Sequence, residues 1–253
     1  MKNQYFGDVG DFGKYGLLLS ILNTNLKLGV NWYLTNDDET NDGSHINYLK
    51  SQSTYDYEKC DKELFSYLND CIKNGERNVR NIENYSRFKN TYFYSDIIDI
   101  SSINALNPQG RDERRAVRKK CFETSLKRLS DCEIIFLDPD NGLETSSVSK
   151  ASKDSVKYVF YDEVRELYRL GKSVITYNHR DRSKEVDYKK RIVKIYDELG
   201  YDIKLLILRF GRYSVRDYIF VLQDKHYNIV EKQINEFLKG NWSSLFKYYE
   251  CKL

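Results

Sequence analysis

The chain has 253 residues, 31% of them charged, and a formal net charge of +3. This length allows one large domain or two small ones, and the weakly basic balance is compatible with an anionic partner. No segment reaches the roughly 18 apolar residues of a membrane span, and no N-terminal segment has the pattern of a signal peptide. The five cysteines show no CxxC spacing, which is typical of reduced thiols rather than of a zinc site or disulfide framework. We therefore expect a cytoplasmic protein without a membrane partner.

The spacing of apolar residues predicts alternating helices and strands in the first half of the chain. In chain order we expect a helix capped by Asp11, a strand, an acidic turn, a mainly helical insertion and one or two short strands, at 11–23, 30–34, 35–43, 44–90 and 92–98. No Gly/Ser-rich linker separates these segments. The chain is therefore expected to form a single domain, 1–253, that carries the insertion at about 44–90.

The second half continues this alternation and ends in a hairpin. We expect a helix, a strand, an interrupted helix, a strand, a helix and two final strands, at 111–130, 134–137, 151–170, 173–177, 184–199, 203–210 and 218–222. The turn at 211–214 joins the last two strands into an antiparallel hairpin. The order predicts an α/β fold whose sheet is mostly parallel and is completed by an antiparallel strand.

Carboxylates follow the most apolar of these strands. Residues 134–137 form a run of four apolar residues, typical of a strand buried on both faces of a parallel sheet. The segment behind it combines three carboxylates with an amide: Asp138, Asp140, Asn141 and Glu144. Because open α/β sheets bind ligands at the carboxyl ends of their strands, this segment is the first candidate for a site. The alternative is a solvated turn, for which one proline or glycine would be enough.

Two segments resemble a known enzyme family. Residues 7–15, Gly-Asp-Val-Gly-Asp-Phe-Gly-Lys-Tyr, are similar to the G-N-x-A-D-V-x-K-H element of bacterial large-subunit ribosomal RNA adenine-N6 methyltransferases, and Gly7, Asp11 and Lys14 are identical to it. The strand at 134–137 with Asp138-Pro139 resembles their fourth strand and its D-P-P-[YF] motif. The sheet of these class I, Rossmann-like methyltransferases also receives an antiparallel strand last.

This resemblance implies an S-adenosylmethionine-dependent methyltransferase that acts on nucleic acid, with an adenine amine as the specific acceptor. On this hypothesis we expect the catalytic residues to be Asp138, Asp140, Asn141 and Lys14. We expect the cofactor to contact Asp8, Asp11, Asp37 and Asp38. Asp138 and the carbonyl of Pro139 would accept the two amine hydrogens.

The chain departs from the family at two places. Asp140 and Asn141 stand where the motif has a second proline and an aromatic ring, and Tyr161 or Tyr177 is a candidate replacement for that ring. The turn after the first strand, 36–43, is acidic and has a single glycine. In this fold a glycine-rich turn normally lets the backbone approach the cofactor closely.

Two other functions use the same residues. Carboxylates that converge without histidine or cysteine suit Mg²⁺, so a metal-dependent nuclease or phosphodiesterase is an alternative. Its ligands would be Asp138, Asp140, Glu144 and Glu163, with Arg165 in place of the usual lysine. The third hypothesis is a catalytically silent module that binds nucleic acid.

The basic face of the helix at 111–130 is the candidate contact for DNA or RNA. Arg114, Arg115 and Arg118 would bind phosphates there, and an ordinary solvated face is the alternative. His179 follows a predicted strand and is either a general base or a structural histidine.

Overall fold

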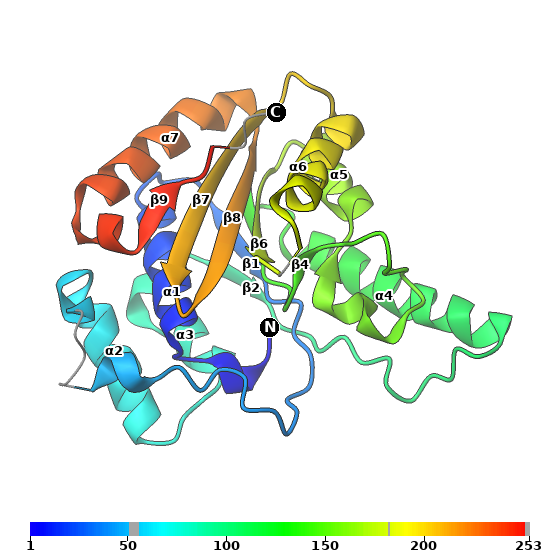
Figure 1. Cartoon of the computed structure of the whole chain (residues 1–253), viewed down its shortest axis with the longest axis horizontal. Helices are drawn as coiled ribbons and strands as arrows, with labels where there is room; N and C mark the ends of the chain where they lie inside the picture. Colours follow the sequence, from blue (N-terminus) through cyan, green and yellow to red (C-terminus); the bar gives the residue numbers. More distant parts are fainter. Residues whose placement is uncertain (51–55, 182, 251–253) are drawn as a thin grey trace.

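A seven-stranded sheet forms the centre of the protein in a computed structural model that describes residues 1–50, 56–181 and 183–250 (Figure 1). Its strands follow the order β2-β1-β3-β6-β8-β7-β9. Their bounds are β1 Leu28–Asn31, β2 Tyr92–Tyr94, β3 Ile134–Leu137, β6 Ser173–His179, β7 Lys204–Arg212, β8 Ser214–Leu222 and β9 Phe246–Tyr248. A separate parallel pair consists of β4 (Gly142–Leu143) and β5 (Tyr158–Val159).

Five strands of the central sheet point the same way. β1 pairs in parallel with both β2 and β3, and β3 pairs in parallel with β6. β8 is antiparallel to β6 and β7, so that β7 points in the direction of β6, and β9 is antiparallel to β7. The predicted α/β class, the mostly parallel sheet and the terminal hairpin are therefore confirmed.

Helices cover both faces of the sheet (Figure 1). α1 (Val9–Leu22), α2 (Lys62–Lys73), α3 (Val79–Glu83) and α7 (Asp224–Lys239) contribute to one apolar core, and α4 (Pro108–Arg128), α5 (Tyr161–Arg169) and α6 (Glu185–Leu199) contribute to the other. Successive residues of β3 point to alternate faces, so Ile134 and Phe136 belong to the first core and Ile135 and Leu137 to the second. This double burial explains the unbroken apolar run.

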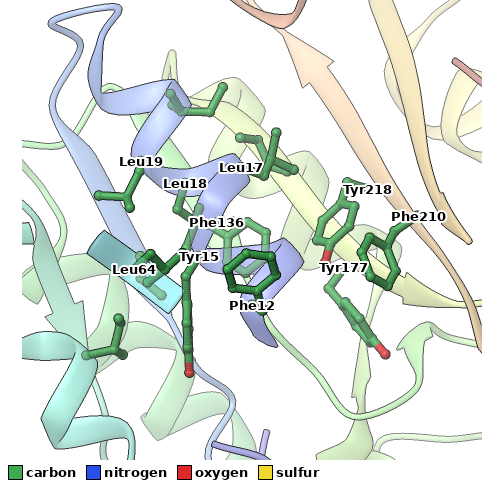
Figure 2. Close-up of a cluster of buried hydrophobic side chains, with 14 of the residues drawn as sticks. Phe12, Tyr15, Leu17, Leu18, Leu19, Leu64, Phe136, Tyr177, Phe210 and Tyr218 are labelled. Atoms are coloured by element: carbon green, nitrogen blue, oxygen red, sulfur yellow. The ribbon is translucent and has the colours of Figure 1, made fainter. Parts of the chain in front are cut away.

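Figure 2 shows the first core where α1 crosses the sheet. Phe12, Tyr15 and Leu18 of α1 belong to the same core as Phe136 of β3, and all four side chains are fully buried. α2 adds Leu64 to this same cluster. The helices expected within 44–90 thus pack directly on the sheet's own core; residues 51–55 of that segment lie outside the described residues.

Several predicted boundaries are wrong. Asp8, rather than Asp11, caps α1, because its side chain accepts a hydrogen bond from the Asp11 amide at 2.8 Å. β1 ends at Asn31, and Tyr33 has a φ of 45° that turns the chain out of the strand. Residues 97–98 form no strand, and α7 and β9 were not predicted.

No helix among the described residues is long and apolar enough to cross a bilayer.

Candidate functional site

A cavity of about 340 Å³ opens at the carboxyl ends of β3 and β6, beside the first turn of α1. The lining includes all four predicted catalytic residues and two of the predicted cofactor contacts: Asp138, Asp140, Asn141, Lys14, Asp8 and Asp11. Arg216 enters from β8. Because β8 is antiparallel, its first residues lie at the edge where β3 and β6 end. Charged groups of both signs therefore converge in one cavity.

The loop after β3 is held against β6 by specific contacts. The Asn178 side chain accepts a hydrogen bond from the Leu143 amide at 2.9 Å, and the His179 amide donates to the Asn141 carbonyl at 3.0 Å. Gly142 makes this approach possible, since its φ is 113° and a Cβ there would lie 2.1 Å from the Asn178 side-chain oxygen. The glycine of the loop is thus required by the position of the site carboxylates.

Lys14 is a buried cation between two buried carboxylates. Its Nζ donates to Asp138 Oδ2 at 2.7 Å and to Asp11 Oδ1 at 2.8 Å. Burial lowers the pKa of Lys14, but the two carboxylates outweigh burial and raise that pKa above its ordinary value. Burial also raises the pKa of Asp138, against the opposing effect of Lys14. Lys14 therefore stays charged and holds the Asp138 side chain in place.

A second charged pair lies at the start of α1. Arg216 Nη2 is 3.7 Å from Asp8 Oδ2, and both side chains are largely buried. Burial and the neighbouring Asp11 raise the pKa of Asp8, and Arg216 opposes them. A Cβ on Gly10 would lie 2.4 Å from the Arg216 guanidinium carbon, so this glycine makes room for the arginine. Arg216 was missed in the sequence, although an arginine at the start of an otherwise largely apolar strand is a usable signal.

Asp140 is buried and forms an ion pair with the N-terminal ammonium. Its Oδ1 lies 2.6 Å from the N-terminal ammonium, and its side chain is 5% exposed. Within the described residues, neither carboxylate oxygen accepts a hydrogen bond with acceptable geometry. The ammonium balances the charge of Asp140, and the carboxylate keeps lone pairs that no described hydrogen bond uses.

Aromatic and imidazole side chains complete the cavity. Tyr177 lines it, with Lys14 Nζ 5.6 Å from its ring centroid. Tyr161, the other candidate for a stacking ring, instead packs in the second core and donates its hydroxyl to the Arg191 carbonyl. His179 also lines the cavity, and burial followed by Arg216 lowers its pKa. His45 lies at the rim and stacks on Tyr213 of the β7–β8 turn, with 4.6 Å between ring centroids.

Asp37 and Asp38 do not line this cavity. Asp37 Oδ1 accepts a hydrogen bond from the Gln4 amide at 3.0 Å, and Asp38 Oδ2 pairs with Lys2 Nζ at 2.5 Å. These two carboxylates bind residues 2–4 of the N-terminal segment to the loop that follows β1.

The four carboxylates expected for a metal do not converge. Glu144 Oε1 accepts from the Tyr161 amide at 3.0 Å, and Glu163 forms a buried ion pair with Arg118 at 2.8 Å. In the part of the chain that the structure describes, no three His, Cys, Asp or Glu side chains are grouped so that they could hold a metal ion.

The predicted phosphate-binding face of α4 is wrong for Arg118. This side chain is 2% exposed and donates to the carbonyls of Ser155 and Tyr158 as well as to Glu163. Arg114 is half-buried and donates to the Ile103 carbonyl. Arg115 is exposed and pairs with Asp112 at 2.6 Å. α4 therefore packs through a face that contains an arginine, because Glu163 on α5 neutralises its charge.

No protein-family model matches the sequence, and no curated protein is significantly similar to it.

Proposed function

We propose that the protein is an S-adenosylmethionine-dependent methyltransferase that acts on an exocyclic amine of a nucleic-acid base. The observation that carries this proposal is the contact between Lys14 and Asp138, which are 124 positions apart. Each belongs to one of the two segments that resemble the ribosomal RNA adenine-N6 methyltransferases. The fold brings these two segments, far apart in the sequence, to one cavity, which supports the proposal.

The topology supports the same proposal. The chain leaves β1 toward β2 on one side and later returns to place β3 on its other side, so β1 and β3 flank a switch point of the kind at which open α/β sheets bind ligands. β8, the later strand of the hairpin, is inserted antiparallel between β6 and β7. Class I methyltransferases have this late insertion.

The charges of the cavity suit the proposed cofactor, which carries a carboxylate, an ammonium and a sulfonium and supplies the methyl group when bound. Arg216 would hold its carboxylate, while Asp8 would face its positive charges. The turn after β1 differs from the usual glycine-rich one, since Trp32 and Tyr33 are buried there. Tyr33 adopts the positive φ that a glycine would favour, so the backbone bends without a glycine.

The chain's own residues then orient the acceptor. Asp138 and the Pro139 carbonyl accept the two amine hydrogens, so that the nitrogen lone pair is free to form the new N–C bond. Lys14 fixes the Asp138 carboxylate. The proton that the nitrogen sheds passes to Asp138, since burial raises the pKa of that carboxyl. Tyr177 offers a ring at the cavity wall against which the base can stack.

Features at the rim support a nucleic-acid substrate. The stacked pair of His45 and Tyr213 is exposed, with Tyr213 62% accessible. Exposed aromatic and imidazole rings beside a cavity suit stacking on neighbouring bases.

Calorimetric titration with S-adenosylmethionine and, separately, with Mg²⁺ tests the proposal, together with transfer of a labelled methyl group to bacterial RNA and DNA. We expect saturable binding of the cofactor. Asp138→Asn keeps an oxygen that can accept from the amine and should retain part of the activity. Asp138→Ala should lose roughly a hundredfold or more of the activity. Binding of Mg²⁺ without binding of the cofactor would contradict the proposal and favour the nuclease hypothesis.

A further inference from the structure

Asp140 is a buried carboxylate of the cavity that can select between the bases of a nucleic acid. It stands where the resembling motif has a proline, so it is a chain-specific addition of two acceptor oxygens. The side chain is 5% exposed and lines the cavity two positions after Asp138. Its Oδ1 faces the N-terminal ammonium, and neither oxygen accepts a well-formed hydrogen bond from any described residue.

A carboxylate selects between bases by the group that lies beside their amine. Each of its oxygens has two lone pairs, so Asp140 can accept from a ligand while Oδ1 still faces the ammonium. Adenine and cytosine present a ring nitrogen acceptor next to the amine, and its lone pair would face the lone pairs of Asp140. Guanine presents the N1–H donor next to the N2 amine, which matches a carboxylate with two parallel hydrogen bonds.

Resting on the proposed function, we propose that the acceptor is the N2 amine of guanine, with Asp140 pairing to N1–H and to one N2 hydrogen. Asp138 and the Pro139 carbonyl accept the remaining N2 hydrogen. The N2–C bond forms as the methyl leaves the sulfonium, and the N2 proton passes to Asp138. Adenine, which the sequence resemblance implied, leaves Asp140 buried against an acceptor, an arrangement that costs free energy.

The first test measures binding alone. The wild-type protein is titrated calorimetrically with guanosine 5′-monophosphate and with adenosine 5′-monophosphate, and guanosine monophosphate should bind at least tenfold more tightly. Asp140→Asn replaces one acceptor by a donor of the same size, which matches the N1 acceptor and N6 donor of adenine. This variant should lose roughly tenfold to a hundredfold in affinity for guanosine monophosphate and bind adenosine monophosphate more tightly.

Glu39→Gln is the matched control. Glu39 is exposed on the loop behind β1, so this substitution removes the same charge without changing an acceptor in the cavity. The nucleotide preference of Glu39→Gln should equal that of the wild type. Circular dichroism of Asp140→Asn shows whether this variant is folded. Asp140→Ala should lose the preference for guanosine monophosphate without gaining affinity for adenosine monophosphate, which separates a loss of recognition from misfolding.

The second test identifies the product. Bacterial RNA is incubated with the protein and labelled S-adenosylmethionine, digested and analysed by mass spectrometry, and we expect N2-methylguanosine. N6-methyladenosine as the product would overturn this inference and leave the proposed function standing. Failure to bind S-adenosylmethionine would overturn the proposed function, and the nucleotide titrations would still decide on guanine. Equal affinity for both nucleotides, or a preference unchanged in Asp140→Asn, would also overturn the inference.

Discussion

Lys14 is the residue on which the charge balance of the cavity depends most. Its ammonium lies within 2.8 Å of two carboxylates, and all three side chains are at most 5% exposed. Removal of one member of such a group leaves buried charges without a partner, which costs far more than the loss of an exposed pair. The residue therefore stabilises the fold as well as the orientation of Asp138.

Lys14→Met should lower the free energy of unfolding by about 3–5 kcal/mol at pH 7.5, because Asp11 and Asp138 lose their buried cation. The loss should be smaller at pH 5. Burial already raises the pKa of Asp138, and this pKa should rise further once Lys14 is gone. A protein with a carboxyl whose pKa is higher in the folded than in the unfolded state becomes more stable as pH falls. Urea denaturation at both pH values measures this difference.

Lys190→Met is the control for this substitution. Lys190 is exposed on α6 and pairs with Asp187 at the surface, so its loss should change stability by less than about 0.5 kcal/mol. A Lys14→Met variant that is equally destabilised at both pH values would contradict the role assigned to the buried carboxylates.

Site residues could be predicted from the sequence where they belong to one local motif. Asp138, Asp140 and Asn141 follow an apolar strand, and this signal is contained in one segment. Arg118 and Glu163 were misassigned for the opposite reason. An arginine on a helix and a glutamate 45 positions later carry no sign in the sequence that they neutralise each other in the core.

At the scale of the element, α1 approaches its neighbours through glycines. A Cβ on Gly13 would lie 2.5 Å from the Phe210 ring of β7, and one on Gly16 would lie 2.2 Å from the Trp242 ring. Glycine inside a helix normally costs roughly 0.5–1 kcal/mol relative to alanine. Here it permits the close packing that brings Asp8, Asp11 and Lys14 to the cavity.

Gly13→Ala and Gly16→Ala should therefore destabilise the protein by about 1–3 kcal/mol each, despite the higher helix propensity of alanine. Thermal and urea denaturation measure the change. Gly211→Ala in β7 is the control, since a Cβ at that position would have no atom of the described residues within 4 Å beyond its immediate chain neighbours, and it should shift stability by less than about 0.5 kcal/mol. Stabilisation by Gly13→Ala would show that the helix does not depend on this close approach.

The helices and strands differ in how well the sequence predicts them. β3, β6 and the hairpin have apolar runs bounded by turns, and their positions were predicted within a few residues. α7 was missed although its buried Val230, Ile234 and Phe237 recur at helical spacing, so that signal was present. β9 has only three residues, and its pairing with β7 depends on tertiary contacts that short-range patterns do not encode.

At the scale of the whole molecule, the sheet separates two apolar cores that share its strands. Both tryptophans of the chain, Trp32 and Trp242, belong to the first core. Tryptophan fluorescence therefore reports on one face of the sheet, whereas circular dichroism reports on helices of both faces. Because β3 contributes alternate residues to each core, neither face can lose its packing without disturbing the strands that support the other.

Ile192→Ala on α6 tests this coupling. Ile192 is fully buried in the second core, and its truncation should cost about 2–5 kcal/mol. If the two cores unfold together, the fluorescence midpoint should fall as far as the circular dichroism midpoint, although both tryptophans lie on the opposite face. Val186→Ala, on the same helix but 65% exposed, should leave both midpoints unchanged. A dichroism transition that separates from the fluorescence transition would mean that the two faces unfold independently.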